Sequence, residues 1–247
     1  MSIRMLRKTI RRLILESETT VGHKMIFLAG LPGGGKSTLL KRLGIADQFT
    51  NCNIDNFYED DLIPELGTAD LAQVEDDYSE LENKRKKHLE GKGPDLSSAE
   101  RTEHLRLADI RSRAQTMFQG AIKQFKAQVG EVCQLGSNFI IDGTASNFKK
   151  IIEDKRRYEE MGYECAMIFV DIDTATSIER NIARGKGGGR SIANHIIRRQ
   201  GKGMPGNIEP YAIEFGENFF LVENRGSMED YEEAIDAIKD GVELFMR

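Results

Sequence analysis

The sequence predicts an α/β protein whose parallel sheet is covered by helices on both faces. Five segments of strand length, four of them apolar, recur along the chain, and helical segments separate most of them. Parallel strands need a crossover connection, which a helix usually supplies, so this alternation indicates a parallel sheet. A glycine-rich loop directly after the first run is the third observation, because it joins a strand to a helix.

Four of the predicted strands are short apolar runs, and "TNCNID" is the expected short second strand. The first is "KMIFLA", which ends directly in the glycine loop, and the third, "NFIID", ends in an acid. Runs of this kind are typical of strands buried on both faces. The five expected strands cover residues 24–29, 50–55, 138–142, 165–171 and 218–224.

The predicted helices follow from apolar spacing and from start signals. Ser97 with Glu100 resembles a capping box, and apolar residues then recur at helical spacing to about residue 133. Ser227 is the expected start of the last helix. Between Phe57 and about Gly93 we find no strong period. The remaining expected helices cover residues 37–44, 147–161 and 174–185, and another begins near Ser191.

The chain divides into a short N-terminal segment and one larger domain. Residues 1–18 predict a basic amphipathic helix, which we interpret as a frayed or packed arm, a partner-binding segment or a targeting leader. Residues 22–247 form the expected domain, with an insertion at about 57–134. The N-terminal helix and residues 57–97 are the surfaces on which a protein partner would bind.

Composition excludes several protein classes. With 247 residues and 30% charged residues, the chain is typical of a globular protein, and its longest apolar run is far shorter than a membrane span. The odd count of three cysteines has no zinc or disulfide spacing, so we expect a reducing cytoplasm, no membrane and buried thiols at Cys52, Cys133 and Cys165.

Negative charge is concentrated in one segment. Residues 59–83 hold ten carboxylates and no Lys or Arg. A solvated acidic face is the simplest interpretation, and a polyanion would be repelled there. The sequence therefore disfavours a nucleic acid partner.

The loop "GLPGGGKS" is the most specific motif. Gly30, Gly35, Lys36 and Ser37 satisfy the pattern G-x-x-x-x-G-K-[ST]. Glycines let the backbone approach phosphate oxygens, the lysine adds charge on the β- and γ-phosphates, and the serine hydroxyl is a magnesium ligand. A glycine turn without a ligand is the alternative, but the flanking strand and helix favour ATP and Mg²⁺. The expected nucleotide-binding residues are Gly30, Gly33, Gly34, Gly35, Lys36, Ser37 and Thr38.

Two aspartates end predicted strands, where open α/β sheets bind their ligands. Asp55 is the candidate base that would deprotonate a phosphoryl acceptor. Asp142 is the candidate carboxylate of the magnesium shell, together with Ser37. The alternative for both aspartates is an ordinary turn residue.

Arginines follow the fourth strand in "ERNIARGKGGGRS". Arg180 and Arg184 lie four residues apart on one helical face, and Arg190 follows a glycine-rich stretch. A closing loop that carries arginines can bring a cation to the charge that develops on a transferring phosphoryl group. Arg184 and Arg190 are therefore catalytic candidates beside Lys36 and Asp55, and a solvated basic loop is the alternative.

The glycine loop, the strand ending in Asp55 and the arginine segment together resemble the P-loop phosphotransferases, in particular the zeta-toxin and polynucleotide-kinase branch. The resemblance covers residues 24–56 and 138–224. It implies a P-loop NTPase fold with strand order 2-3-1-4-5, Asp55 as the base, Lys36 on the phosphates, and Arg184 and Arg190 as lid cations.

The sequence thus predicts an ATP-dependent kinase that moves the γ-phosphoryl group to a hydroxyl of a small molecule, nucleotide or nucleotide sugar. Two alternatives stay open. One is a polynucleotide 5′-hydroxyl kinase, which the acidic segment disfavours. The other is a nucleotide-binding module that switches or assembles without phosphoryl transfer.

Overall fold

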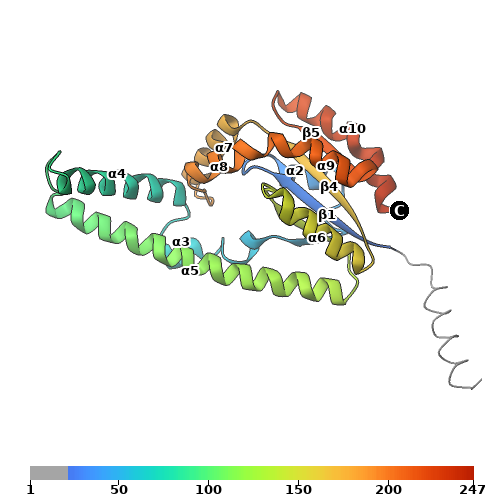
Figure 1. The fold of residues 1–247 in the computed structure, drawn as a ribbon, viewed down its shortest axis with the longest axis horizontal. Coiled ribbons are helices and arrows are strands. Elements are labelled where there is room, and N and C mark those ends of the chain that lie inside the picture. Colours follow the sequence, from blue (N-terminus) through green and yellow to red (C-terminus); the bar gives the residue numbers. More distant parts are fainter. Residues whose placement is uncertain (1–21) are drawn as a thin grey trace, which may run out of the picture.

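The computed structural model describes residues 22–247, so the expected helix at residues 1–18 lies outside the described part. Its centre is a five-stranded parallel sheet in the order β2-β3-β1-β4-β5, as expected (Figure 1). The strands are β1 (His23–Gly30), β2 (Thr50–Cys52), β3 (Phe139–Gly143), β4 (Tyr163–Asp171) and β5 (Phe219–Glu223).

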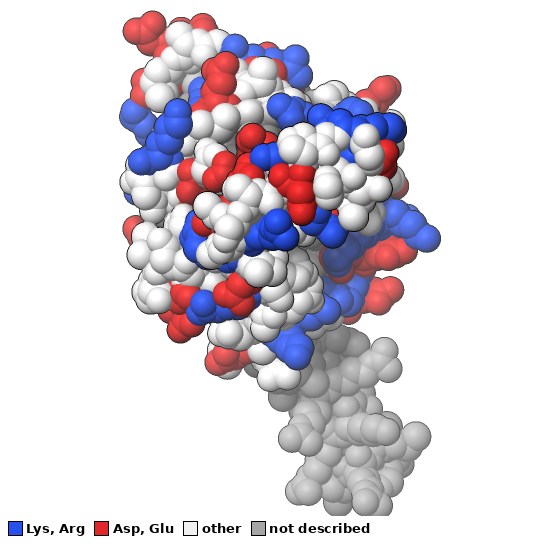
Figure 2. Space-filling model, turned by 90° about the vertical axis from the view of Figure 1, so that its left-hand side faces the viewer, with Lys and Arg blue, Asp and Glu red and all other residues white. Residues whose placement is uncertain are grey.

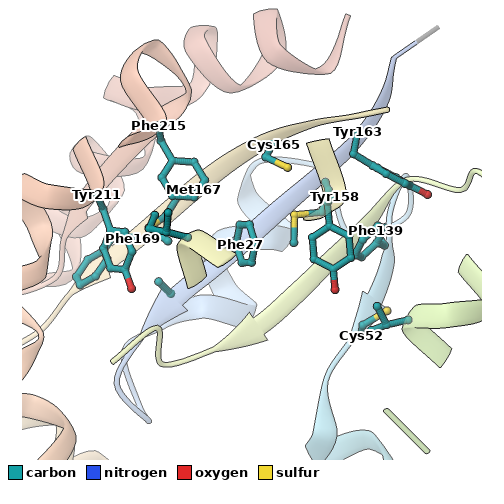
Figure 3. Packing of buried hydrophobic residues seen from close by; sticks show 14 of the residues in the cluster. Phe27, Cys52, Phe139, Tyr158, Tyr163, Cys165, Met167, Phe169, Tyr211 and Phe215 are labelled. Carbon is teal, nitrogen blue, oxygen red and sulfur yellow. The ribbon is translucent and has the colours of Figure 1, made fainter. Parts of the chain in front are cut away.

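Helices cover both faces of the sheet. The side chains beneath α6 (Phe148–Glu160) and α9 (Ile208–Phe215) form the larger core, in which Phe27, Phe139 and Phe169 are almost fully buried (Figure 3). On the opposite face, α2 (Lys36–Arg42) and α10 (Met228–Met246) bury a second apolar cluster. These two layers confirm the predicted α/β architecture.

A helical hairpin extends from this core (Figure 1). It consists of α4 (Leu71–Leu89) and the N-terminal part of α5 (Ser98–Gln134), preceded by the short α3 (Leu62–Leu66). With 37 residues, α5 is about 55 Å long, so its C-terminal part packs on the sheet while its N-terminal part pairs with α4. The capping box between Ser97 and Glu100 starts α5 as predicted.

The sequence analysis missed α4. Only two of its residues, Ala72 and Val74, are buried, so its apolar period is weak. The helix is instead fixed by contacts with α5, including the Glu75–Arg111 and Lys84–Glu100 ion pairs. The short α9, which follows Pro205, was also missed.

Two boundaries differ from expectation. β2 ends at Cys52 rather than at residue 55, and a 3-10 turn, η1 (Ile54–Phe57), follows it. α7 (Thr174–Lys186) runs as predicted, but α8 (Asn194–Gly203) begins after Ser191, because the backbone at Ser191 bridges to Asp70 instead. Within residues 22–247, no helix is long and apolar enough to span a bilayer.

Candidate active site

The glycine loop follows β1 at the carboxyl edge of the sheet, as predicted. Gly33 and Gly35 adopt positive φ angles of 71° and 90°. A Cβ at Gly35 would lie 2.8 Å from the Tyr231 hydroxyl, and one at Gly33 would lie 2.9 Å from the Cβ of Arg180. These positions therefore require glycine for both conformation and space.

Neighbouring elements hold the loop by its carbonyl oxygens. Asn224 donates to the Gly34 carbonyl over 2.8 Å, and the Tyr231 hydroxyl donates to that of Gly35 over 3.0 Å. From α7, Ser177 donates to the Pro32 carbonyl and Arg180 to that of Gly33. Fixing the carbonyl oxygens in this way pre-organises the loop backbone, and Arg180 thus supports the loop from α7.

Lys36 and Asp142 form the centre of the site. Asp142 lies on β3 beside Leu28 of β1, and its carboxylate is 3.6 Å from the Lys36 ammonium nitrogen. Lys36 also donates to the Gly30 carbonyl over 2.9 Å, while Asn53 donates to the other Asp142 oxygen over 3.1 Å. Burial raises the pKa of Asp142, although the positive charge of Lys36 acts against this shift.

Asp55 lies in the η1 turn and not at the end of β2. The side chain of Asn53 accepts from the backbone N–H of Asp55 over 2.9 Å and so fixes the turn. One carboxylate oxygen of Asp55 accepts from Arg190 over 2.6 Å. The predicted base and the predicted lid cation are therefore in direct contact.

Arg190 reaches Asp55 from the lid, by which we mean α7, α8 and the residues that connect them. Its side chain is only 9% exposed, and its guanidinium lies 5.0 Å from the centre of the Tyr58 ring. Its Nε is buried without a hydrogen-bond partner among the described residues. Arg184, near the C-terminal end of α7, pairs with Glu59.

Ser191 connects the lid to the start of α4 by hydrogen bonds. The side chain of Ser191 is fully buried; its hydroxyl donates to the Asp70 carboxylate and accepts from the N–H of Ala72 over 2.9 Å. Its own N–H donates to the Ala69 carbonyl over 3.1 Å. These contacts fix the residue next to Arg190 and thereby the position of that cation.

One cavity of about 1050 Å³ brings the predicted site residues together. Gly33 to Thr38, Asp55, Asp142, Arg184 and Arg190 all line it. Gly30 ends β1 and does not line the cavity; it contributes its carbonyl to Lys36 instead. The cavity continues along the facing sides of α4 and α5.

The acidic segment at residues 59–83 is partly neutralised in the folded chain. Figure 2 shows acidic and basic side chains interleaved on this side of the molecule. Four of the ten carboxylates form ion pairs with arginines of the lid or the hairpin, namely Glu59 with Arg184, Glu65 with Arg113, Glu75 with Arg111 and Glu82 with Arg85. Repulsion of a polyanion is weaker than the sequence alone suggested.

Sequence reasoning missed several residues that shape the site. Asn53 links the two aspartates, Asp70 and Ser191 fix the lid, and Asn224 holds the loop. For Asn53, the order Asn-x-Asp at the end of a predicted strand was a usable signal, because such asparagines commonly cap turns. Asn224 directly follows β5, at the same edge of the sheet as the loop.

The residues present fit a nucleoside triphosphate and a magnesium ion. Gly33 and Gly35 leave no room for a Cβ beside Arg180 and Tyr231, so the loop presents bare backbone, and the buried Nε of Arg190 is a donor without a partner among the described residues. In the part of the chain that the structure describes, no cluster of three or more His, Cys, Asp or Glu residues could hold a metal by itself. Ser37 and Asp142 would therefore hold Mg²⁺ together with phosphate oxygens, the usual arrangement for this ion.

Cys52 and Cys165 are buried, Cys133 is partly buried, and all three thiols are free, as expected. Burial raises the pKa of Cys52 to about 11. A thiol of this kind stays protonated at neutral pH and serves as a small apolar side chain.

Comparison with known proteins gives a family match and several similar folds. Residues 103–236 match the sequence model of the zeta toxin family. A candidate kinase from Chloroflexus aurantiacus J-10-fl is 14% identical, with a TM-score of 0.51 over 92% of this chain and 100% of that chain. No curated protein matches the chain.

Two further solved structures are similar to a lesser degree. One belongs to the PezAT chromosomal toxin-antitoxin system of Streptococcus pneumoniae, with 13% identity and a TM-score of 0.48 over 100% of this chain and 97% of that chain. The other belongs to the Pnkp1/Rnl/Hen1 RNA repair complex, with 19% identity and a TM-score of 0.48 over 79% of this chain and 48% of that chain.

Proposed function

The chain belongs to the zeta toxin family, and we propose that it is an ATP-dependent kinase that phosphorylates a hydroxyl group of a small molecule. The observation that carries this proposal is the shared cavity, in which the glycine loop, Lys36, Asp55 and Arg190 meet. A nucleotide-binding switch would need the loop, but it would not need a carboxylate and a lid cation at the same place.

Each residue of the site has a separate role in the proposed phosphoryl transfer. The loop backbone and Lys36 bind the triphosphate, and Arg184 and Arg190 stabilise the charge that develops on the transferring group. Ser37 and Asp142 would hold Mg²⁺, which neutralises phosphate charge when it is bound. Asp55 orients the acceptor hydroxyl and takes its proton.

The reaction exchanges one phosphorus–oxygen bond for another. A bond forms between the acceptor oxygen and the γ-phosphorus, and the bond from that phosphorus to the β,γ-bridging oxygen breaks. ADP leaves with the bond's electron pair, and the acceptor's proton goes to Asp55. In the structure, Asp55 accepts from Arg190. Transfer therefore requires Arg190 to turn from Asp55 to the phosphate.

The decisive experiment is transfer of labelled γ-phosphate from ATP to a panel of hydroxyl compounds, with Asp55→Asn as the inactive control. Transfer by the wild type that the variant loses supports the proposal. ATP binding without transfer to any compound would favour the switch.

A 5′-hydroxyl oligonucleotide belongs in the same panel, because the ion pairs of residues 59–83 reduce the repulsion that argued against it. Transfer to the oligonucleotide alone, with a steep fall in rate as salt is added, would favour a polynucleotide kinase.

A further inference from the structure

A second cavity, of about 440 Å³, lies at the amino edge of the sheet, opposite the glycine loop. The end of α6, the start of β4 and the end of α9 contribute its lining. Its apolar groups include Tyr163 and Cys165 of β4 and Phe215 of α9 (Figure 3). Gly22 also lines this cavity, so the part of the chain that precedes the described residues begins at its rim.

Packing of His23 fixes the place where the chain enters the sheet. His23 is the register partner of Tyr163 in the β1–β4 pair, and the centres of their rings lie 5.5 Å apart. A Cβ at Gly136, in the turn after α5, would lie only 2.7 Å from the His23 ring. His23 therefore packs against two elements, and Gly22 is held beside the cavity.

Negative charge surrounds this cavity. Five exposed carboxylates either line it or directly adjoin a lining residue in the sequence, namely Glu159, Glu160, Glu164, Glu214 and Glu217. Two of them have a cation partner, because Lys155 pairs with Glu159 over 2.6 Å and Lys24 pairs with Glu164. Within residues 22–247 the other three form no ion pair, so this end of the domain can accept further positive charge.

The segment at residues 1–21 has the complementary charge. It contains five basic and two acidic residues, a net charge of +3, which leaves −8 on residues 22–247. The basic residues are Arg4, Arg7, Lys8, Arg11 and Arg12. On the opposite face of the helix that the sequence predicts lie Ile3, Leu6, Ile10, Leu13 and Ile14. An acidic surface with an apolar hollow fits such a helix.

The lengths also agree. A helix over residues 3–15 would be about 20 Å long. Residues 16–21 would connect it to Gly22 and can span up to about 20 Å, so the helix can return to the cavity. A helix of this length is marginally stable alone in water and needs an apolar surface to pack on. So short a connection also gives the segment a local concentration on the order of millimolar, with which a separate partner would have to compete.

We propose that residues 1–21 dock on this cavity of their own chain as an amphipathic helix. Its apolar side chains contact the cavity, and its basic side chains pair with the surrounding carboxylates. Of the interpretations that the sequence left open for this segment, the packed arm is the one that these observations support. The cavity lies at the opposite edge of the sheet from the glycine loop, so the docking does not depend on the proposed function.

Hydrogen exchange of the amides at residues 3–15, measured by mass spectrometry on the full-length protein, tests the docking. We expect exchange at least about tenfold slower than in an unstructured chain, because docking protects the helix. Replacing two carboxylates by Glu160→Lys and Glu217→Lys should speed this exchange at least about fivefold, and salt at about 1 M should have a similar effect on the wild type.

Glu229→Lys with Glu233→Lys is the matched control. It makes the same change of charge at two exposed carboxylates of α10, outside the cavity lining, and should leave the exchange of residues 3–15 unchanged. Adding Arg7→Glu and Arg11→Glu to the Glu160→Lys, Glu217→Lys variant should restore slow exchange, because the attraction returns with reversed signs.

Three results would overturn the proposal. The first is wild-type exchange at the rate of an unstructured chain. The second is slow exchange that persists in the Glu160→Lys, Glu217→Lys variant. The third is protection that rises with protein concentration together with a dimer in analytical ultracentrifugation, which would place the segment on a second copy of the chain.

Discussion

Replacing Asp55 by Asn should change ATP affinity and turnover in opposite directions. Asp55 accepts from Arg190 over 2.6 Å, and the two side chains are only 30% and 9% exposed. In the proposed reaction Arg190 must leave this carboxylate to reach the γ-phosphate. The carboxylate therefore competes with ATP for Arg190, and it is also the base.

The size of both effects follows from these contacts. A hydrogen bond to a charged group contributes about 1.5 to 3 kcal/mol, and an asparagine oxygen retains part of it. If the substitution weakens the interaction between residue 55 and Arg190 by roughly 1 kcal/mol, ATP should bind about 3- to 10-fold more tightly. Loss of a general base should lower kcat about 100- to 10,000-fold.

The assay is titration calorimetry with ATP and Mg²⁺, followed by phosphate transfer to the best acceptor of the panel. Asp60→Asn is the matched control, since Asp60 is exposed in the same segment and does not line the cavity. Weaker ATP binding by Asp55→Asn, or a rate close to that of the wild type, would refute this reasoning and leave Asp55 as a turn residue.

Three further predictions concern the loop, the lid and the hairpin. Lys36→Ala should weaken ATP binding by about 3 kcal/mol, because charge-assisted phosphate contacts are strong; equal affinities in calorimetry would contradict the nucleotide site. Ser191→Ala should lower kcat about fivefold or more by loosening Arg190, since it removes buried hydrogen bonds. The same change in an Arg190→Lys background should add little, and additive losses would indicate a merely structural role. The hydrogen bond from Arg85 holds the pKa of Glu82 at about 2, below its ordinary 4.5. The stabilisation from Glu82 is therefore present above about pH 4.5 and is lost as the pH falls toward 2. Glu82→Gln should reduce the change of Tm with pH in this range. A curve of Tm against pH identical to that of the wild type would mean that the Glu82–Arg85 pair does not stabilise the fold.

Local sequence patterns were sufficient to predict most of the strands and helices of the fold. Short strand-like segments, four of them apolar, placed all five strands, the Ser97–Glu100 capping box placed the start of the longest helix, and the run of glycines before Lys36 marked the loop. These signals involve residues within a few positions of one another. The resemblance to P-loop kinases added the strand order, which the structure confirms.

The candidate site could be predicted only as a set of residues. The sequence pointed to Lys36, Asp55, Asp142 and the lid arginines, but it could not show that Arg190 contacts Asp55, 135 positions away. It also gave no sign that Ser191 fastens the lid to Asp70.

The hairpin and the balance of charge were decided by tertiary structure. α4 has too few buried residues for a clear period, and it is held in part by Arg111 of α5, which pairs with Glu75. Arg111 and Arg113 of α5 neutralise Glu75 and Glu65, which belong to a segment that carries no Lys or Arg in the sequence. By itself the sequence determined the strands, most of the helices and the phosphate loop, because these depend on neighbouring residues. The partners of each charge depend on how distant segments pack together, and only the folded chain determines that.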